Sequence, residues 1–302
     1  MKIFFVGNAN GKVKEHFFKI TEPIFIKNNI SMERFFSIDE FLKKYKYENN
    51  ELKIIINIYH EDTLNYNDFT IMEKKLYKND ILIHPTKLGI IVGSKKNTNI
   101  FLSEKNILCP KIIDKTDKNL VVFENENNTS GANVRLLYEN DVLNHKKYNT
   151  EFIDTLYKHN NELYYSSIRT LCVGNEIVAV FLRFRNVKEN NPSVHCKDTP
   201  LISSLINSYY EEVIIPNIGN LTKICENIGN VLGLGFYAHD FAYSFKDNDF
   251  FLLETGFKLH DSTHSNKVKS ISKKLNFITD DTKICESVAN TFIKKIKKYE
   301  KF

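Results

Sequence analysis

The sequence lacks the features that would assign a protein class at first sight. Its 302 residues include five cysteines, and none forms a Cys-x-x-Cys pair. This spacing predicts reduced thiols and favours neither a disulfide framework nor a zinc site. No apolar run approaches the roughly 20 residues that a membrane-spanning helix needs, and the N-terminal strand pattern is too short for a secretory signal. We therefore expect a cytoplasmic chain with no membrane partner.

The chain also lacks a large excess of charge of either sign. Lys and Arg number 42 and Asp and Glu 37, a formal net charge of +5, with part of the excess in the lysine-rich segment 294–298. Lysines near a helix C-terminus complement the helix dipole, so this segment gives little support for nucleic-acid binding. Hydrophobic residues make up 42% and aromatic residues 13%. This composition predicts a globular protein that binds no nucleic acid.

The N-terminal part lacks the glycine spacing of a dinucleotide-binding fingerprint. Gly-Asn-Ala-Asn-Gly at 7–11 follows an expected strand at 2–6, and it also lacks the lysine of a P-loop. A plain turn is therefore the favoured interpretation. Further strands are expected at 52–58 and 81–85, with a helix before Asn28. Strands that alternate with helices predict a small parallel α/β sheet.

The middle of the chain has a strong hairpin pattern. Two β-rich runs, 164–173 and 176–185, are joined by a Gly-Asn pair that is typical of tight hairpin turns. Arg183 and Arg185 are two residues apart and therefore lie on one face of their strand. With no acidic residue beside them in the strand, they favour an anionic partner. Exposure to solvent is the alternative interpretation.

Three helices have clear boundaries in the sequence. Ser94 is a typical N-cap for a helix over 95–105. Asn220 is expected to cap a helix that ends at Gly233, and a last amphipathic helix is predicted over 281–298. We expect the last two of these helices to pack on the sheets and not to carry chemistry.

The most informative pattern is a hairpin expected just after Gly233. Two apolar runs flank a polar turn at 245–249, and each run carries one carboxylate, Asp240 or Glu254. Antiparallel pairing across such a turn places these two residues opposite each other. Facing carboxylates in an apolar hairpin repel each other unless a cation lies between them, and hard oxygen ligands suit Mg²⁺. The hairpin therefore predicts a magnesium site and suggests a nucleotide-phosphate site.

A polar loop of small residues occupies 127–133, between expected strands at 120–123 and 134–137. The amides of such a loop can cover phosphates. An ordinary hairpin turn has the same composition. The residues alone leave both interpretations open.

The order of these segments from about residue 90 to residue 261 resembles the ATP-grasp superfamily, which includes glutathione synthetase, D-alanine–D-alanine ligase and the ribosomal-protein glutamate ligases. A lysine-started helix is followed by the small-residue loop, by Glu-Phe-Ile, by two arginine-bearing strands and by the Asp-to-Glu hairpin. The resemblance implies an α/β (α+β) fold, with an ATP-grasp fold after a small parallel-sheet domain. It implies three parts: an N-terminal α/β domain (1–88), a small ATP-grasp lid subdomain (89–160) and a large subdomain with the metal hairpin and the C-terminal helix (161–302).

The resemblance also implies roles for individual residues. Lys95, with Lys96 as an adjacent candidate, matches the lysine that reaches an ATP phosphate. The phosphate-covering loop matches Ser130, Gly131 and Ala132. The hinge whose backbone receives the adenine matches Glu151, Phe152 and Ile153. Catalytic roles in holding phosphoryl and carboxylate groups fall on Arg169, Arg183 and Arg185. The Mg²⁺ ligands are Asp240 and Glu254.

The implied activity is that of an ATP-dependent ligase. It would join a small carboxylate, such as an amino acid, to an amine through an acyl phosphate, with ATP and Mg²⁺ as cofactors, and a homodimer is compatible with the family. The sequence departs from the family at Phe123, near which a second nucleotide-binding lysine is expected, and at Gly256, where the family has asparagine. These departures keep two alternatives open: a non-catalytic nucleotide- or partner-binding module, and a small-molecule kinase.

Overall fold

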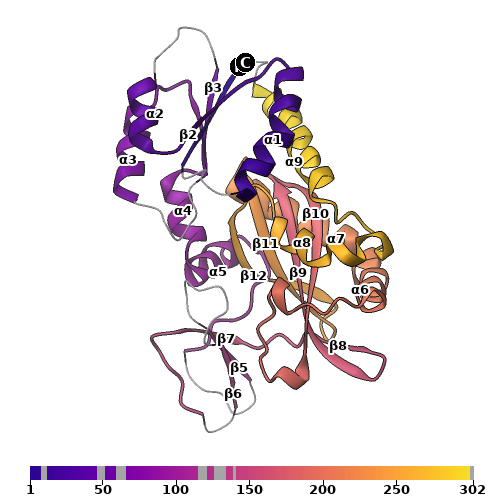
Figure 1. Ribbon diagram of the computed structural model, residues 1–302. Coiled ribbons are helices and arrows are strands. Elements are labelled where there is room, and N and C mark those ends of the chain that lie inside the picture. Colours follow the sequence, from indigo (N-terminus) through magenta and orange to yellow (C-terminus); the bar gives the residue numbers. More distant parts are fainter. Residues whose placement is uncertain are drawn as a thin grey trace.

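Three β-sheets organise the part of the chain that the structure describes. The computed structural model describes residues 1–7, 12–45, 52–58, 66–114, 121–125, 134–138 and 141–299. The sheets have four strands within 2–83, three within 122–151 and five within 156–257. Figure 1 shows the four-stranded sheet at one end of the molecule and the three-stranded sheet at the other, with the five-stranded sheet alongside. This mixture of sheets and covering helices confirms the predicted α/β (α+β) class, while the domain boundaries at 88 and 160 stay predictions.

The four-stranded sheet is parallel throughout, in the order β2-β1-β3-β4. Its strands are β1 (Lys2–Val6), β2 (Ser31–Phe35), β3 (Lys53–Asn57) and β4 (Ile81–Ile83). Its helices are α1 (Lys12–Lys27), α2 (Ile38–Lys44), α3 (Tyr66–Lys75) and α4 (Thr86–Val92). Every residue of β3 is buried, as its isoleucine run predicts. Strand β2 lies at the edge of the sheet and is more exposed and more polar than β3. The sequence pattern therefore does not predict a strand at these residues.

The five-stranded sheet is antiparallel, in the order β10-β9-β11-β12 with β8 also paired to β9. Its strands are β8 (Leu156–His159), β9 (Glu162–Val173), β10 (Glu176–Asn186), β11 (Phe236–Ser244) and β12 (Asp249–Phe257). Asp240 of β11 pairs directly with Glu254 of β12, which confirms the predicted register. A β-bulge follows this pair, because Phe241 is opposite Leu252.

The three-stranded sheet is antiparallel, in the order β6-β5-β7. Its strands are β5 (Val122–Asn125), β6 (Arg135–Leu137) and β7 (Tyr148–Glu151). The predicted strands on either side of the small-residue loop are therefore confirmed. The loop itself, 127–133, lies outside the described residues.

Most predicted helix boundaries are confirmed. Ser94 caps α5 (Lys95–Ser103), since its Oγ accepts the amide N–H of Asn97 at 3.2 Å. The last predicted helix is α9 (Asp281–Ile296). Short elements complete the described chain: α8 (Ser262–Val268) and 3₁₀ turns at 187–189, 196–198 and 269–274. Within that part of the chain no helix has the length and apolar character needed to cross a membrane.

The predicted helix cap at Asn220 is wrong. The helix α7 (Ile215–Leu232) begins before it and continues from α6 (Ser203–Tyr209) through a π-helical segment, Tyr210–Ile214. Asn220 therefore lies inside a helix, and its Nδ2 donates to Asp249 Oδ1 at 2.9 Å. The predicted end of this helix is confirmed, because Gly233 has a φ of +84°.

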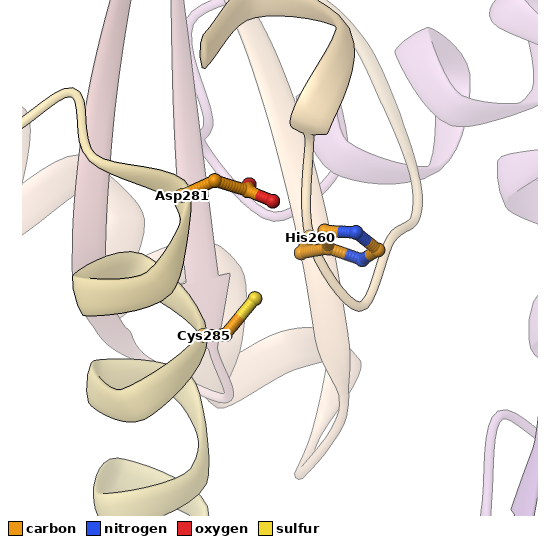
Figure 2. A group of neighbouring side chains, drawn as sticks. All are labelled: His260, Asp281 and Cys285. Carbon is orange, nitrogen blue, oxygen red and sulfur yellow. The ribbon is translucent and has the colours of Figure 1, made fainter. Parts of the chain in front are cut away.

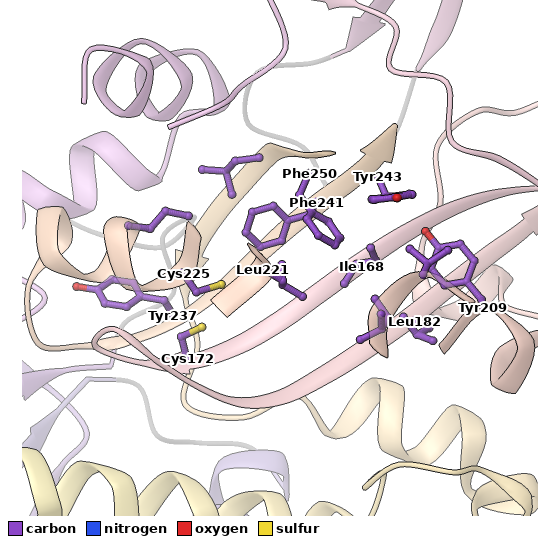
Figure 3. Packing of buried hydrophobic residues seen from close by; sticks show 14 of the residues in the cluster. Ile168, Cys172, Leu182, Tyr209, Leu221, Cys225, Tyr237, Phe241, Tyr243 and Phe250 are labelled. Carbon is purple, nitrogen blue, oxygen red and sulfur yellow. The ribbon is translucent and has the colours of Figure 1, made fainter. Parts of the chain in front are cut away.

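Helices cover both faces of the five-stranded sheet. On one face, Leu221 and Cys225 of α7 share a buried cluster with Cys172 of β9 (Figure 3). On the other face, Phe292 of α9 shares a second cluster with Leu171 of β9 and with residues of β1 and α1. Alternate residues of β9 thus enter different clusters, which fixes the sheet between two layers of helix.

Candidate functional site

A cavity of about 340 Å³ lies between the three-stranded and the five-stranded sheets. Its walls come from β5 and β7 on one side and from β9, β10, β11 and β12 on the other, together with the first residue of α5. The structure brings eight of the residues predicted for a nucleotide site to this one cavity: Lys95, Glu151, Phe152, Ile153, Arg169, Arg183, Asp240 and Glu254.

Two arginines and two aspartates form an ion-pair cluster at the five-stranded sheet. Arg169 donates to Asp240 from Nε to Oδ1 at 2.6 Å and from Nη2 to Oδ2 at 2.7 Å. Its Nη1 donates to Asp261 Oδ2 at 2.8 Å. Arg183 Nη1 donates to Asp240 Oδ2 at 3.1 Å. The two positive and two negative charges balance, so the cluster has no formal net charge.

The arginines keep both aspartates of this cluster ionised. Burial by itself raises the pKa of a carboxyl group, but Arg169 and Arg183 outweigh burial and hold the pKa of Asp240 well below its usual range. Burial is likewise outweighed at Asp261, where Arg169 and then Lys258 lower the pKa to about 2. Both carboxylates therefore carry a full negative charge at neutral pH.

Glu254 lies opposite Asp240, and its Oε2 is 3.4 Å from Nζ of Lys95. Its Oε1 accepts no hydrogen bond within the described residues, and Oδ1 of Asp240 accepts a single one. Both carboxylates thus retain oxygen lone pairs on adjacent strands, and these hard donors fit a Mg²⁺ ion. Position 256 is glycine and supplies no side-chain oxygen, so water or phosphate oxygens would have to complete the coordination.

Aromatic side chains line another part of the cavity. The rings of Phe123 and Phe152 are stacked, with centroids 6.5 Å apart and an interplanar angle of 18°. Tyr165 meets the Phe152 ring edge-on at 6.2 Å. Flat apolar faces of this kind contact the faces of planar rings favourably. This wall therefore suits an aromatic base.

The segment predicted to receive the adenine makes fixed backbone contacts. The amide N–H of Glu151 donates to the Lys111 carbonyl at 2.9 Å, and that of Phe152 donates to the Val121 carbonyl at 2.8 Å. The amide of Ile153 makes no hydrogen bond within the described part of the chain. Of these three amides, the one at Ile153 is therefore the one left for a ligand.

Three buried polar atoms in the cavity wall have no hydrogen-bond partner among the described residues: Asn125 Oδ1, Ser167 Oγ and Arg183 Nε. Buried polar atoms are nearly always hydrogen-bonded in folded proteins. The Asn125 oxygen can accept, the Arg183 nitrogen can donate, and the Ser167 hydroxyl can do either. These atoms favour a polar ligand with both donors and acceptors.

The other predicted site residues do not line this cavity within the described chain. Lys96 is exposed on α5. Arg185 forms ion pairs with Asp198 and, at 3.4 Å, with Glu189, so acids of the chain itself are its partners. The predicted phosphate-covering residues lie outside the described part of the chain: Ser130, Gly131 and Ala132.

The structure also adds residues to the set predicted for the site. His195 and Lys258 line the cavity. Burial, followed by the charge of Arg183, lowers the pKa of His195, so this side chain is neutral at pH 7. Asp261 anchors Arg169 although 92 positions separate the two residues. No local pattern indicates such a contact.

Comparison with solved structures identifies the fold. No protein-family model matches the sequence, and no curated protein matches it significantly. Solved structures do match. N5-carboxyaminoimidazole synthetase from Staphylococcus aureus has a TM-score of 0.54 at 9% identity, covering 95% of this chain and 77% of that one.

Two further structures cover nearly the whole of both chains. A RimK domain ATP-grasp protein from Sphaerobacter thermophilus has a TM-score of 0.52 at 9% identity, covering 97% of this chain and 99% of that one. D-alanine–D-alanine ligase from Bacillus anthracis has a TM-score of 0.50 at 10% identity, covering 99% of each chain. The chain therefore has the ATP-grasp fold, as its sequence predicts.

Proposed function

We propose that this chain is an ATP-dependent carboxylate–amine ligase that uses Mg²⁺. One observation carries the proposal: a single cavity collects Lys95, two of the three predicted arginines, the hinge segment and the two carboxylates that the ATP-grasp resemblance assigns to the site. Among proteins of the same fold, one is named a synthetase and another a ligase, which supports the reaction class. The proposed substrates are a small carboxylate, such as an amino acid, and an amine.

The cavity offers distinct surfaces to the two ends of a nucleotide. The aromatic wall at Phe123 and Phe152 suits the base, and the amide of Ile153 can donate to it. Lys95 and Arg183 supply positive charge for the phosphates. The volume of about 340 Å³ is at the lower end of the range for small-molecule pockets.

Glu254 and Asp240 are the proposed ligands of Mg²⁺, which would neutralise phosphate charge during phosphoryl transfer. Arg169 contributes by holding Asp240 through two hydrogen bonds, which keeps that carboxylate ionised and fixed in direction. A preorganised carboxylate loses little entropy when it binds a cation.

The proposed reaction has two steps. A substrate carboxylate oxygen attacks the γ-phosphorus of ATP, the bond from that phosphorus to the bridging oxygen breaks, and ADP leaves with the electron pair. The amine nitrogen then attacks the acyl carbon, phosphate leaves, and the amine proton passes to solvent. Lys95 and Arg183 stabilise the negative charge on the transferred phosphoryl group through hydrogen bonds and charge.

A nucleotide-binding module without turnover is the second candidate. The observation that favours it is that the Asp240 carboxylate already accepts three hydrogen bonds from arginine side chains. Gly256 supplies no further metal ligand. In such a site the arginines supply the positive charge that Mg²⁺ supplies in a ligase. The site would then bind a nucleotide without transferring its phosphate.

A product assay separates these functions. The protein is incubated with ATP, Mg²⁺ and pools of amino acids and small carboxylates, with and without hydroxylamine, and ADP, AMP and free phosphate are measured. A ligase gives equal ADP and phosphate with one carboxylate pool, and hydroxylamine traps the acyl phosphate as a hydroxamate. ADP without phosphate would indicate a kinase, and AMP would contradict an acyl phosphate. ATP binding with no product in any pool would support the binding module.

A further inference from the structure

His260, Asp281 and Cys285 form a compact group of potential metal ligands outside the cavity lining. One ligand atom from each residue lies within 4.8 Å of those from the other two. Asp281 and Cys285 stand one turn apart at the start of α9, and His260 lies in the segment that follows β12. Figure 2 shows the Asp281 carboxylate and the Cys285 sulfur on the side of α9 that faces His260.

The surroundings of this group are buried. Cys285 is 0% exposed and His260 is 4% exposed, and the Phe17 ring stacks on the His260 ring at 5.4 Å. Asp281 Oδ2 lies 3.2 Å from Nε2 of His16. Asp281 Oδ1 is buried and has no hydrogen-bond partner within the described residues. A buried carboxylate oxygen without a partner is unfavourable unless the group is protonated or binds a cation.

The donor types select a class of metal. Sulfur, imidazole nitrogen and carboxylate oxygen together are typical ligands of zinc, whereas Mg²⁺ prefers oxygen alone. Bond lengths of about 2.0–2.3 Å place ligand atoms of a tetrahedral zinc roughly 3.5 Å apart. Closing the observed 4.8 Å to that spacing requires side-chain shifts of roughly 1 Å, which rotamer adjustments can supply.

We propose that His260, Asp281 and Cys285 bind one zinc ion, with Oδ1 as the aspartate ligand. His16 holds the other carboxylate oxygen and so orients Asp281 for the metal. The ion joins the first turn of α9 to the segment after β12. His260 directly precedes Asp261, the partner of Arg169. A bound ion would fix the segment that anchors the arginine cluster.

The thiol of Cys285 has to lose its proton when it binds a metal ion. Burial and then the neighbouring Asp281 raise the pKa of the Cys285 thiol to about 12, and burial also raises the pKa of Asp281. The thiol is therefore protonated without a cation. Zinc binding displaces the thiol proton to solvent and forms a zinc–thiolate bond. The cysteine spacing did not predict this site, because its ligands stand at 260, 281 and 285 and include a single cysteine.

Cobalt titration tests the site in the full chain. Protein stripped of metal with a chelator is titrated with Co²⁺, whose bond to a thiolate gives a charge-transfer absorption, and Zn²⁺ is then added to displace it. We expect one Co²⁺ per chain with that absorption and displacement by one equivalent of Zn²⁺. Cys285→Ser should abolish the absorption. Cys225→Ser is the control and should retain it, because this equally buried cysteine lies on α7 in a different cluster.

Circular dichroism establishes that each variant is folded. No cobalt–thiolate absorption in the natural chain, its persistence in folded Cys285→Ser, or its loss in folded Cys225→Ser would each overturn the proposal. If Cys285→Ser does not fold, Asp281→Asn and His260→Gln decide. Each should weaken Co²⁺ binding by more than about tenfold, the lower limit expected even for loss of a residue that only orients a ligand. Unchanged affinity in both would overturn the site.

Discussion

Arg169 donates two parallel hydrogen bonds to Asp240, at 2.6 Å and 2.7 Å, from the strand position directly opposite it. The pairing of β9 with β11 therefore sets this contact, and the bidentate geometry makes it specific as well as strong. It places a permanently charged carboxylate at the cavity wall.

Removing the charge of Asp240 should destabilise the fold. Asp240→Asn leaves two buried guanidinium groups with Asp261 as their remaining carboxylate, so we expect the free energy of unfolding to fall by about 3–5 kcal/mol. Asp249→Asn is the control, because Asp249 lies beside the turn of the same hairpin and accepts an exposed hydrogen bond from Asn220. Urea unfolding at pH 7 measures both variants. Equal losses in the two would contradict the importance of the cluster.

Adjacent lysines at the start of α5 provide a matched pair for the phosphate contact. Lys95 lines the cavity 3.4 Å from Glu254, whereas Lys96 is exposed and lies outside the lining. Lys95→Gln should weaken binding of ATP with Mg²⁺ by about tenfold or more, the effect of losing a charged hydrogen bond. Lys96→Gln should change it by less than about twofold, as expected for a screened surface charge. Calorimetry at fixed ionic strength measures both, and the reverse order of effects would assign the contact to Lys96.

Two glycines of α7 should respond in opposite ways to alanine. A Cβ at Gly229 would lie 2.3 Å from Cα of Asn175 and 2.5 Å from the carbonyl oxygen of Gly174, both backbone atoms of the β9–β10 turn. Gly229→Ala should therefore destabilise the protein by about 1–3 kcal/mol or more. A Cβ at Gly219 would meet nothing within 4 Å, so Gly219→Ala should stabilise it by up to about 1 kcal/mol.

Thermal unfolding of both glycine variants tests this close approach. A lower melting temperature for Gly229→Ala and an unchanged or higher one for Gly219→Ala is the expected result. If Gly229→Ala unfolds at the same temperature as the natural chain, α7 does not pack closely on the β9–β10 turn.

His84 should make stability depend on pH. Its Nδ1 lies 2.9 Å from the Asn57 carbonyl oxygen, and its Nε2 accepts the amide N–H of Phe236 at 2.8 Å, so the ring links the first sheet to β11. Burial lowers its pKa from 6.5 to about 4. Because the folded pKa is the lower one, the unfolded state takes up the proton first as the pH falls. The stabilisation is complete above about pH 6.5 and is lost between pH 6.5 and about pH 4.

The His84→Gln variant isolates this contribution. A glutamine amide can also donate and accept, but it does not titrate. Between pH 7 and pH 5 the free energy of unfolding should fall by about 2 kcal/mol more in the natural chain than in His84→Gln. Other buried histidines are present in both proteins and cancel. Parallel falls in urea titrations at the two pH values would contradict the burial of a neutral His84.

Local patterns in the sequence predicted much of the fold. The Gly-Asn turn between β9 and β10, the cap at Ser94 and the opposition of Asp240 to Glu254 each depend on residues close in the chain. The cap predicted at Asn220 failed, because α6 continues through a π-helical segment into α7 and packing overrides a local preference.

Long-range contacts explain what the sequence did not predict. Arg169 and Asp261 are 92 positions apart, and His84 and Phe236 are 152 apart. Contacts of this kind follow from how sheets and helices pack, and no periodicity or spacing in the sequence encodes them. The group around Cys285 has the same origin, since its histidine comes from a segment outside the helix.

Photolabelling with 8-azido-ATP tests the central claim, that this cavity holds the nucleotide, most directly. The protein is irradiated with the probe and Mg²⁺, with and without excess ATP, and the labelled peptides are sequenced. We expect label on peptides from 121–125 or 148–155, which form the aromatic wall, and loss of that label in excess ATP. Label confined to other segments, or label that ATP does not displace, would contradict the claim.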